Sequence, residues 1–251
     1  MRGLTGKNEI VTGGGGAIGR AISLRLGDEG CAVGIFDIDT AAAAETAERV
    51  VALGGEAQAF AVDVTNYVAV AAAGEVFRDS IGVCDVLVNN AGWDQFGEFL
   101  DTTPDRWNQV IAVNLKSALN MCHTVIPPMR QGGWVRVINM ASDAGRAEAP
   151  GHAVYAASKG ALIAFGKSLA KELAANGITV NAICPSPNDT PLLTALVPDR
   201  ADRDSLADSN PMGRLGVPED IVGLPAFLAS EESSYITGQA ISVSGGRTTH
   251  G

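Results

Sequence analysis

Short apolar runs alternate along the whole chain with longer alanine-rich stretches in which apolar residues recur at helical spacing. The short runs lack a regular alternation of apolar and polar positions, which is typical of strands buried on both faces. Alternating strands and helices predict a doubly wound α/β fold, a parallel sheet of about seven strands with helices on both faces. The predicted strands are Ile10–Thr12, Ala32–Phe36, Ala57–Val62, Val86–Asn89, Val135–Asn139, Thr179–Ile183 and Ala240–Val243.

The predicted helices lie between these strands. No repeat, linker or break in composition divides the chain, so we expect a single domain over residues 1–251. One long segment, 185–216, is rich in Pro, Asp and Ser and shows only a short helical stretch at Leu192–Leu196. Long segments of this kind are commonly active-site lids, although a surface loop without a role is the alternative. The predicted helices are Ile18–Glu29, Ala41–Leu53, Val68–Asp79, Pro104–Arg130, Ala153–Ala175 and Pro218–Ala229.

The 251 residues are acidic, with 18 Lys and Arg against 28 Asp and Glu and a formal net charge of −10. We expect no nucleic-acid partner, because binding one needs clustered positive charge. We also expect no membrane partner, since the sequence shows no basic amphipathic segment and no apolar run long enough to span a bilayer. The four cysteines form no CxxC pair and the first residues lack a signal-peptide core, so a cytoplasmic location is expected.

A glycine-rich turn connects the first predicted strand to the first predicted helix. It reads Thr12-Gly13-Gly14-Gly15-Gly16-Ala17-Ile18-Gly19. Gly14, Gly16 and Gly19 fit a GxGxxG frame, but four successive glycines leave the frame ambiguous. Glycines let the backbone approach a pyrophosphate, whose charge is favoured at a helix N-terminus. The turn therefore predicts a Rossmann-type dinucleotide site.

Asp37 follows the second predicted strand, 18 residues after Gly19. A carboxylate at this place accepts hydrogen bonds from the ribose hydroxyls of adenosine and repels the additional phosphate of NADP. No Lys or Arg interrupts the glycine run. The sequence therefore predicts NAD as the cofactor, although Asp37 could also be a solvated residue at a strand end. Asp63, after the third predicted strand, is expected at the adenine edge.

Tyr155 and Lys159 are four residues apart in a predicted helix and therefore share one of its faces. A free Tyr has a pKa of about 10, too high for a base at neutral pH, but a neighbouring ammonium favours the phenolate. The pair is therefore a candidate general base. Ser142 is placed to hold the substrate oxygen, and Asn114 to orient a water behind Lys159. Taken alone, a Tyr-x-x-x-Lys pair is usually an ordinary surface feature.

Together these residues resemble the short-chain dehydrogenase/reductase family over nearly the entire chain. The resemblance rests on the glycine loop, on Asn89-Asn90-Ala91-Gly92, and on the 13-residue interval between Ser142 and Tyr155. It implies a homotetrameric oxidoreductase that interconverts a secondary alcohol and a ketone with NAD and needs no metal. The catalytic residues that it implies are Asn114, Ser142, Tyr155 and Lys159. The implied cofactor contacts are Gly13, Gly16, Ile18, Gly19, Asp37, Asp63, Val64, Asn90, Ala91, Gly92, Tyr155, Lys159, Pro185, Asn188 and Thr190.

Two positions depart from the family's pattern. Ala17 stands where the family usually has Gly, and its methyl group is expected to weaken cofactor binding modestly. After the sixth predicted strand the family usually has Pro-Gly, whereas this sequence has Pro185-Ser186. Ser186 is expected to change how the 185–216 segment begins. Neither departure involves the proton-transfer residues.

The stretch Asn89 to Asp94 and the C-terminal stretch Ile236 to Gly251 resemble family members that oxidise a cyclic 3-hydroxyacyl-CoA. A small-molecule substrate, in particular a cyclic or aryl-bearing CoA thioester, is therefore expected. Trp93 is expected to line the apolar side of the pocket, with packing in the core as the alternative. The candidate substrate residues are Ser142, Tyr155, Trp93, and, for the thioester or a CoA phosphate, Arg146 and His152, for which a solvated loop is the alternative.

The sequence leaves three alternatives to this function. A 3-oxoacyl-acyl-carrier-protein reductase would generally use NADPH and present a basic face to an acidic carrier, so Asp37 and the net charge of −10 oppose it. A general secondary-alcohol dehydrogenase remains an alternative. A catalytically silent subunit is disfavoured, because such a subunit has no chemical need for an intact Asn-Ser-Tyr-Lys set.

Overall fold

The computed structural model describes residues 1–130, 133–147 and 149–249. Its centre is a sheet of seven parallel strands in the order β3-β2-β1-β4-β5-β6-β7. The strand order reverses between β1 and β4, and ligands of open parallel sheets bind at such a reversal, beyond the carboxyl ends of the strands. The strands are β1 (Asn8–Thr12), β2 (Ala32–Asp37), β3 (Glu56–Ala61), β4 (Val86–Asn89), β5 (Val135–Met140), β6 (Ile178–Pro185) and β7 (Ala240–Val243).

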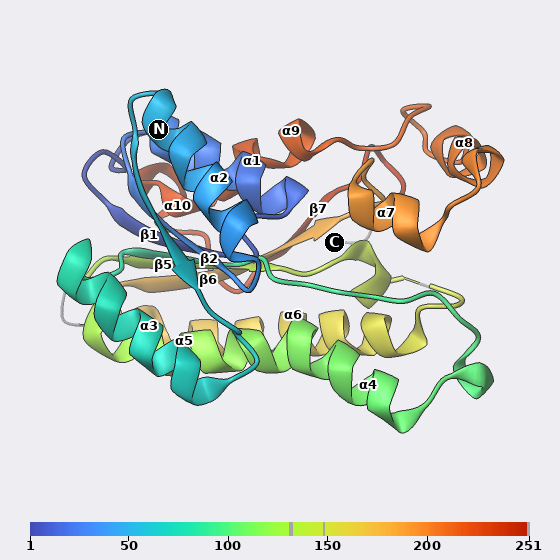
Figure 1. The fold of residues 1–251 in the computed structure, drawn as a ribbon, viewed down its shortest axis with the longest axis horizontal. Helices are drawn as coiled ribbons and strands as arrows, with labels where there is room; N and C mark the ends of the chain where they lie inside the picture. Colours follow the sequence, from blue (N-terminus) through green and yellow to red (C-terminus); the bar gives the residue numbers. More distant parts are fainter. Residues whose placement is uncertain (131–132, 148, 250–251) are drawn as a thin grey trace.

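Helices cover both faces of this sheet (Figure 1). Helices α1, α2, α9 and α10 lie on one face and α3, α4, α5 and α6 on the other, while α7 and α8 lie apart from these two layers. The helices are α1 (Ala17–Asp28), α2 (Thr40–Ala52), α3 (Tyr67–Ser80), α4 (Pro104–Ile111), α5 (Ser117–Met129), α6 (Ala153–Leu173), α7 (Pro191–Leu196), α8 (Arg200–Asp208), α9 (Pro218–Ile221) and α10 (Gly223–Ala229).

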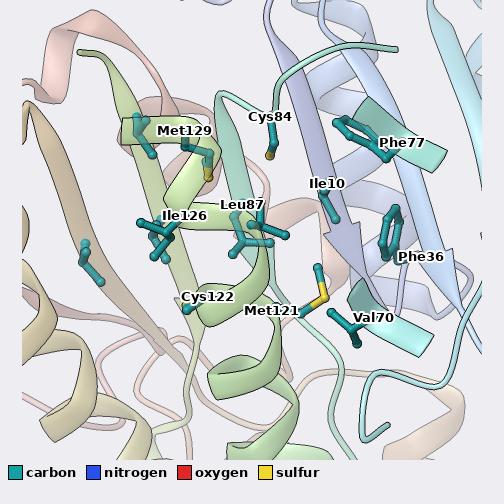
Figure 2. Close-up of a cluster of buried hydrophobic side chains, with 14 of the residues drawn as sticks. Ile10, Phe36, Val70, Phe77, Cys84, Leu87, Met121, Cys122, Ile126 and Met129 are labelled. Carbon is teal, nitrogen blue, oxygen red and sulfur yellow. The ribbon is translucent and has the colours of Figure 1, made fainter. Parts of the chain in front are cut away.

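The two largest clusters of buried side chains lie one against each face of the sheet, and a third, smaller one packs Ile163 of α6 near β6. Figure 2 shows part of the first cluster, in which Ile10 of β1 and Leu87 of β4 lie near Met121 and Ile126 of α5. The second cluster packs β1, β2 and β4 against α1, α2 and α10. Because both faces of the strands are covered, their sequences read as nearly continuous apolar runs.

The predicted fold class is confirmed, and each predicted strand agrees with an observed strand to within two residues at either end. The predicted helix Pro104–Arg130 is interrupted, however, by a π-helical turn at Ala112–Lys116 between α4 and α5. The predicted helix Pro218–Ala229 is divided into α9 and α10. Helix α8 was not predicted, because it has no apolar periodicity. It depends on capping by Asp199, whose side chain accepts from the Ala201 N–H, and has no buried residue.

Among the described residues, no helix combines the length and the apolar character needed to cross a membrane.

Candidate active site

A cavity of about 1460 Å³ lies where the carboxyl ends of the parallel strands meet. It is larger than the roughly 300–1000 Å³ of an ordinary small-molecule pocket and therefore has room for a dinucleotide together with a substrate. Each of the predicted cofactor residues lines it. These are Gly13, Gly16, Ile18, Gly19, Asp37, Asp63, Val64, Asn90, Ala91, Gly92, Tyr155, Lys159, Pro185, Asn188 and Thr190.

The glycine loop forms one end of this cavity and leaves no room for larger side chains. Gly13 adopts a φ of +62°, which only glycine adopts readily. A Cβ on Gly19 would lie 2.1 Å from the Gly13 carbonyl oxygen, and a Cβ on Gly15 would lie 2.7 Å from the Cβ of Ala42. A Cβ on Gly14 would likewise lie 2.7 Å from Ile35 Cγ2. Gly16, by contrast, has only one neighbour, at 3.4 Å. The glycine run is therefore constrained at Gly13, Gly14, Gly15 and Gly19, and Gly16 is the position that tolerates a side chain.

The loop is tied to the end of β4 by Asn90. Its Nδ2 donates to the carbonyl oxygens of Thr12 (2.9 Å) and Gly13 (3.1 Å), and its backbone N–H donates to Thr12 Oγ1 at 2.9 Å. The backbone N–H of Ala91 donates to the same hydroxyl at 3.0 Å. These contacts join the two strands at which the sheet order reverses, so the loop is held in shape by the protein itself.

Asp37, at the end of β2, lies beside this loop. One carboxylate oxygen accepts from the Gly15 N–H and the other from the Asp39 N–H, both at 2.9 Å. A carboxylate has about four acceptor sites, so two remain for a ligand. The crowded glycine loop, the start of α1 and this carboxylate fit the pyrophosphate and adenosine ribose of a dinucleotide.

The Asn114 side chain hydrogen-bonds to backbone groups and does not lie at the cavity surface. It lies in the π-helical turn, its Nδ2 donates to the carbonyls of Trp93 (2.5 Å) and Val110 (2.9 Å), and its Oδ1 accepts from the Trp93 N–H at 3.3 Å. Asn114 does not line the cavity, but a Cβ on Gly92 would lie 3.1 Å from Asn114 Oδ1 and 3.4 Å from Lys159 Nζ. Asn114 and Lys159 thus both lie next to Gly92, and Asn114 fixes the chain at Trp93.

Lys159 is buried in α6, where its Nζ donates to the Met140 carbonyl at 2.8 Å. Loss of water around the ammonium lowers the pKa of Lys159 to about 8. The Nζ atom lies 5.5 Å from the centre of the Tyr155 ring. The two side chains share one face of α6, as their spacing predicted.

The pKa of Tyr155 differs from the expected direction. Burial raises it to about 12, while the hydrogen bond with the Ser142 side chain lowers it and the charge of Asp94 raises it further. Lys159 does not reverse this effect in the protein alone, because its ammonium is directed to the Met140 carbonyl and is itself desolvated. The Tyr155 pKa is thus shifted in the direction opposite to the one that the Tyr155–Lys159 spacing predicted.

The predicted substrate residues divide into two groups. Ser142, Tyr155, Trp93 and His152 all line the cavity. Arg146 does not. Its Nη1 donates to the Ala240 carbonyl (3.3 Å) and to Ser242 Oγ (2.9 Å), so the guanidinium lies against β7. The assignment of Arg146 to a CoA phosphate is therefore corrected, because the arginine is used to join the segment after β5 to the edge strand.

Two residues at the cavity were not singled out from the sequence. Asp94 is buried and contacts His152, and Arg247 lies in the C-terminal segment beside α8, where its Nη1 donates to Ser209 Oγ at 2.8 Å. Asp94 follows Asn-Asn-Ala-Gly closely enough for its position to have been noticed. The sequence around Arg247 contains no motif that predicts a place at the cavity. Arg247 lies there because β7 pairs with β6, the strand that leads into α7 and α8.

Comparison with known proteins identifies relatives along the whole chain. Residues 15–248 match a family model described as enoyl-(acyl carrier protein) reductase. An acetoacetyl-CoA reductase of Shinella zoogloeoides is 39% identical over 240 residues, which cover 95% of this chain and 97% of that protein. A 2-dehydro-3-deoxy-L-rhamnonate dehydrogenase (NAD(+)) of Sphingomonas sp. (strain SKA58) is 36% identical over 245 residues, covering 97% and 96%. The crystal structure of a candidate NAD(P) dependent gluconate 5-dehydrogenase from Beutenbergia cavernae, with NADP bound at low occupancy, has a TM-score of 0.93 at 34% identity and covers 97% of each chain.

Proposed function

The chain belongs to the short-chain dehydrogenase/reductase family, and from this premise we propose that it oxidises a cyclic or aryl-bearing 3-hydroxyacyl-CoA with NAD. The family's chemistry is the interconversion of an alcohol and a ketone with a nicotinamide cofactor. The choice of NAD and of the thioester is the proposal, and each part is supported by a different end of the cavity.

The observation that carries the choice of NAD is the position of Asp37 against the glycine loop. Its carboxylate accepts from Gly15 and lines the cavity, so an additional phosphate on the adenosine ribose would be repelled there. Arg20 lines the same end, but its guanidinium donates to Glu45 at 3.0 Å and to the Gly15 carbonyl at 3.2 Å. Because Glu45 offsets its charge, Arg20 is a poor partner for a phosphate. The name of the Sphingomonas relative also favours NAD, while the bound NADP of the Beutenbergia structure favours the other form.

The proposed chemistry assigns a role to four side chains. A bound oxidised nicotinamide would supply the acceptor for the hydride that leaves the carbinol carbon, and its positive charge would favour the phenolate of Tyr155. Tyr155 takes the proton of the substrate hydroxyl as the C–O bond becomes a carbonyl. Ser142 hydrogen-bonds the same oxygen. Lys159 holds the cofactor ribose and, with Asn114 behind it, is the expected route by which the proton leaves Tyr155.

The thioester part of the proposal rests on the substrate side of the cavity. Trp93 adds an apolar ring to the cavity lining, and α7 and α8 add Leu193 and Leu206. Arg247 adds a cation to the cavity lining next to the end of α8, and a cation there suits a phosphate of CoA. The Shinella relative is named for a CoA thioester substrate. We propose that segment 185–216 acts as a lid, since its two helices line the cavity.

A homotetramer remains part of the proposal. Ile111 of α4 and Leu119 of α5 are exposed apolar side chains on the helical layer that carries Asn114. Sedimentation at micromolar protein concentration tests the assembly, and a monomer would contradict it.

The proposed function is tested with purified protein, NAD or NADP, and three matched substrates. These are a cyclic 3-hydroxyacyl-CoA, its free acid and a plain alicyclic secondary alcohol. The nucleotide handle of CoA contributes binding energy remote from the reacting carbon, so removal of CoA is expected to lower kcat as well as affinity. Equal specificity constants for the three substrates would leave a general secondary-alcohol dehydrogenase. Preferential NADPH-dependent reduction of 3-oxoacyl-acyl-carrier-protein thioesters would instead support the reductase alternative, the activity for which a Chlamydia trachomatis relative 37% identical to this chain is named.

A further inference from the structure

Asp94 and His152 form a buried polar pair in the cavity wall that the proposed chemistry does not use. His152 Nδ1 lies 2.5 Å from Asp94 Oδ2, and both residues line the cavity. The Asp94 side chain is 5% exposed and that of His152 is 25% exposed. In the hydrogen bonds of the described residues, the His152 ring has a partner only at Nδ1, so its Nε2 is left for a ligand.

The two segments that carry this pair are fixed by their own contacts. Asn114 holds the backbone of Trp93, the residue before Asp94, through both its N–H and its carbonyl. The Gly97 N–H donates to the Gly151 carbonyl at 3.0 Å, which joins the loop after β4 to the residue before His152. The positions of the Asp94 carboxylate and the His152 ring are thus set by the surrounding protein, as recognition groups require.

The ring of His152 is also held on one side by Phe96, with ring centroids 5.3 Å apart in an edge-to-face arrangement. Gly151 permits this contact, because a Cβ there would lie 2.1 Å from the Phe96 ring. On the other side, the His152 and Tyr155 ring centroids are 6.4 Å apart. A substrate whose hydroxyl lies at Tyr155 therefore presents to His152 only those atoms that are a few bonds from its carbinol carbon.

We propose that His152, oriented by Asp94, hydrogen-bonds a second oxygen of the substrate close to the reacting carbinol, and that this oxygen belongs to an uncharged carbonyl. This inference rests on the proposed function and deepens it by naming the group that is recognised. This recognition uses the doubly protonated ring, in which Nδ1 donates to the Asp94 carboxylate and Nε2 donates to the carbonyl oxygen. A 3-hydroxyacyl thioester carries such a carbonyl two carbons from its carbinol.

The charge of the pair defines what it excludes. With the ring doubly protonated, His152 and Asp94 together carry no net charge, so a free carboxylate on the substrate gains little attraction at His152. The substrate carboxylate would also be repelled by the negative charge of Asp94, which lies on the Nδ1 side of the His152 ring. The pair is therefore suited to thioesters and esters and not to 3-hydroxy acids. Asp94 is a positioning residue, because it acts on the substrate only through His152.

The experiment compares two small substrates that both lack CoA, so that it does not depend on the nucleotide site. One is a 3-hydroxyacyl thioester of N-acetylcysteamine, and the other is the secondary alcohol of the same carbon skeleton without the carbonyl. His152→Phe keeps a ring beside Phe96 but removes both nitrogen atoms. His123→Phe is the matched control, because His123 lies on α5, hydrogen-bonds Tyr67 and does not line the cavity.

We expect His152→Phe to lower kcat/KM for the thioester at least about tenfold and for the plain alcohol less than about threefold, with the control unchanged. Asp94→Asn should lower kcat/KM for the thioester in the otherwise wild-type protein. It should have no further effect on kcat/KM in the His152→Phe variant, because a positioning residue acts only through His152. His152→Gln, which can still donate to a carbonyl, should recover part of the loss. Equal losses on both substrates would show that the pair only ties two loops together.

A binding measurement separates this inference from the proposed function. Calorimetric titration with the corresponding 3-oxoacyl thioester does not depend on turnover, and His152→Phe should weaken its binding about tenfold. Unchanged binding would overturn the inference even if the enzyme oxidises the thioester. Absence of any NAD-dependent oxidation by the wild-type protein would overturn the proposed function, while weakened binding in the variant would still support the recognition pair.

Discussion

The carboxylate of Asp37 accepts a hydrogen bond from the backbone N–H of Gly15 at 2.9 Å, so the end of β2 is joined to the glycine loop that follows β1. Both residues line the large cavity. The negative charge proposed to discriminate between the two nicotinamide dinucleotides is therefore fixed by the same loop that is expected to hold their pyrophosphate.

We expect Asp37 to make NAD preferred over NADP at least about tenfold in kcat/KM, which corresponds to about 1.4 kcal/mol. Asp37→Ser should narrow this ratio, because a serine hydroxyl can still accept from Gly15 but does not repel a phosphate. Steady-state kinetics with both cofactors provide the measurement. Comparable specificity constants in the wild-type protein would contradict the argument.

Tyr155→Phe should lower kcat by roughly 10²–10⁴-fold, the usual contribution of a general base, and leave NAD binding nearly intact. The variant removes only the ionisable oxygen, so cofactor binding measured by fluorescence is the control for folding. Lys159→Ala should impair both turnover and cofactor binding. Retention of more than about a tenth of the wild-type rate by Tyr155→Phe would exclude it as the base.

The rate of oxidation should rise with pH, because the base is the deprotonated form of Tyr155 and burial raises its pKa to about 12 in the protein alone. The Ser142 hydrogen bond lowers that pKa, so Ser142→Ala should move the profile towards higher pH as well as lower the maximal rate. A profile of kcat/KM against pH checks both effects. A shift of the Ser142→Ala profile towards lower pH would be incompatible with this role.

Arg247→Ala should raise KM for a CoA thioester about tenfold and leave the kinetics of the N-acetylcysteamine thioester unchanged, since only CoA carries phosphates. Arg200→Ala is a matched control, because Arg200 begins α8 but does not line the cavity. If both variants behave alike, or if neither changes KM, the CoA phosphate does not bind at Arg247.

Glu9 predicts a pH dependence of stability that is separate from catalysis. It lies in β1 with both carboxylate oxygens buried and without a hydrogen-bond partner among the described residues, and burial raises its pKa to about 8. The folded protein thus keeps a proton that the unfolded chain releases near pH 4.5, so the free energy of unfolding falls as pH rises from about 4.5 to about 8 and levels off above that.

The loss across this range is at most about 5 kcal/mol, from about 1.4 kcal/mol per pKa unit. Glu9→Gln should remove most of the slope and be more stable than the wild type at pH 9. Urea unfolding between pH 5 and 9 measures this, and an unchanged slope in the variant would show that Glu9 is not the group responsible.

The sequence by itself determined the strands, their order of appearance and the glycine loop. Each of these depends on local properties. A strand buried on both faces must be apolar at successive positions, and a backbone with a φ of +62° at Gly13 that passes close to Gly19 must be glycine there. The pairing of Tyr155 with Lys159 was equally local, because residues four apart share a face of any helix.

Tertiary structure alone decided which charged groups meet. Arg146 follows Ser142 closely in sequence but lies against β7, whereas Arg247, about a hundred residues later, lines the cavity. Asp94 and His152 are 58 residues apart and contact each other because the loops after β4 and before α6 are joined side by side. Such contacts, and the burial that raises the Tyr155 pKa, depend on how strands β4, β5 and β6 are ordered in space, and no local spacing in the sequence encodes that order.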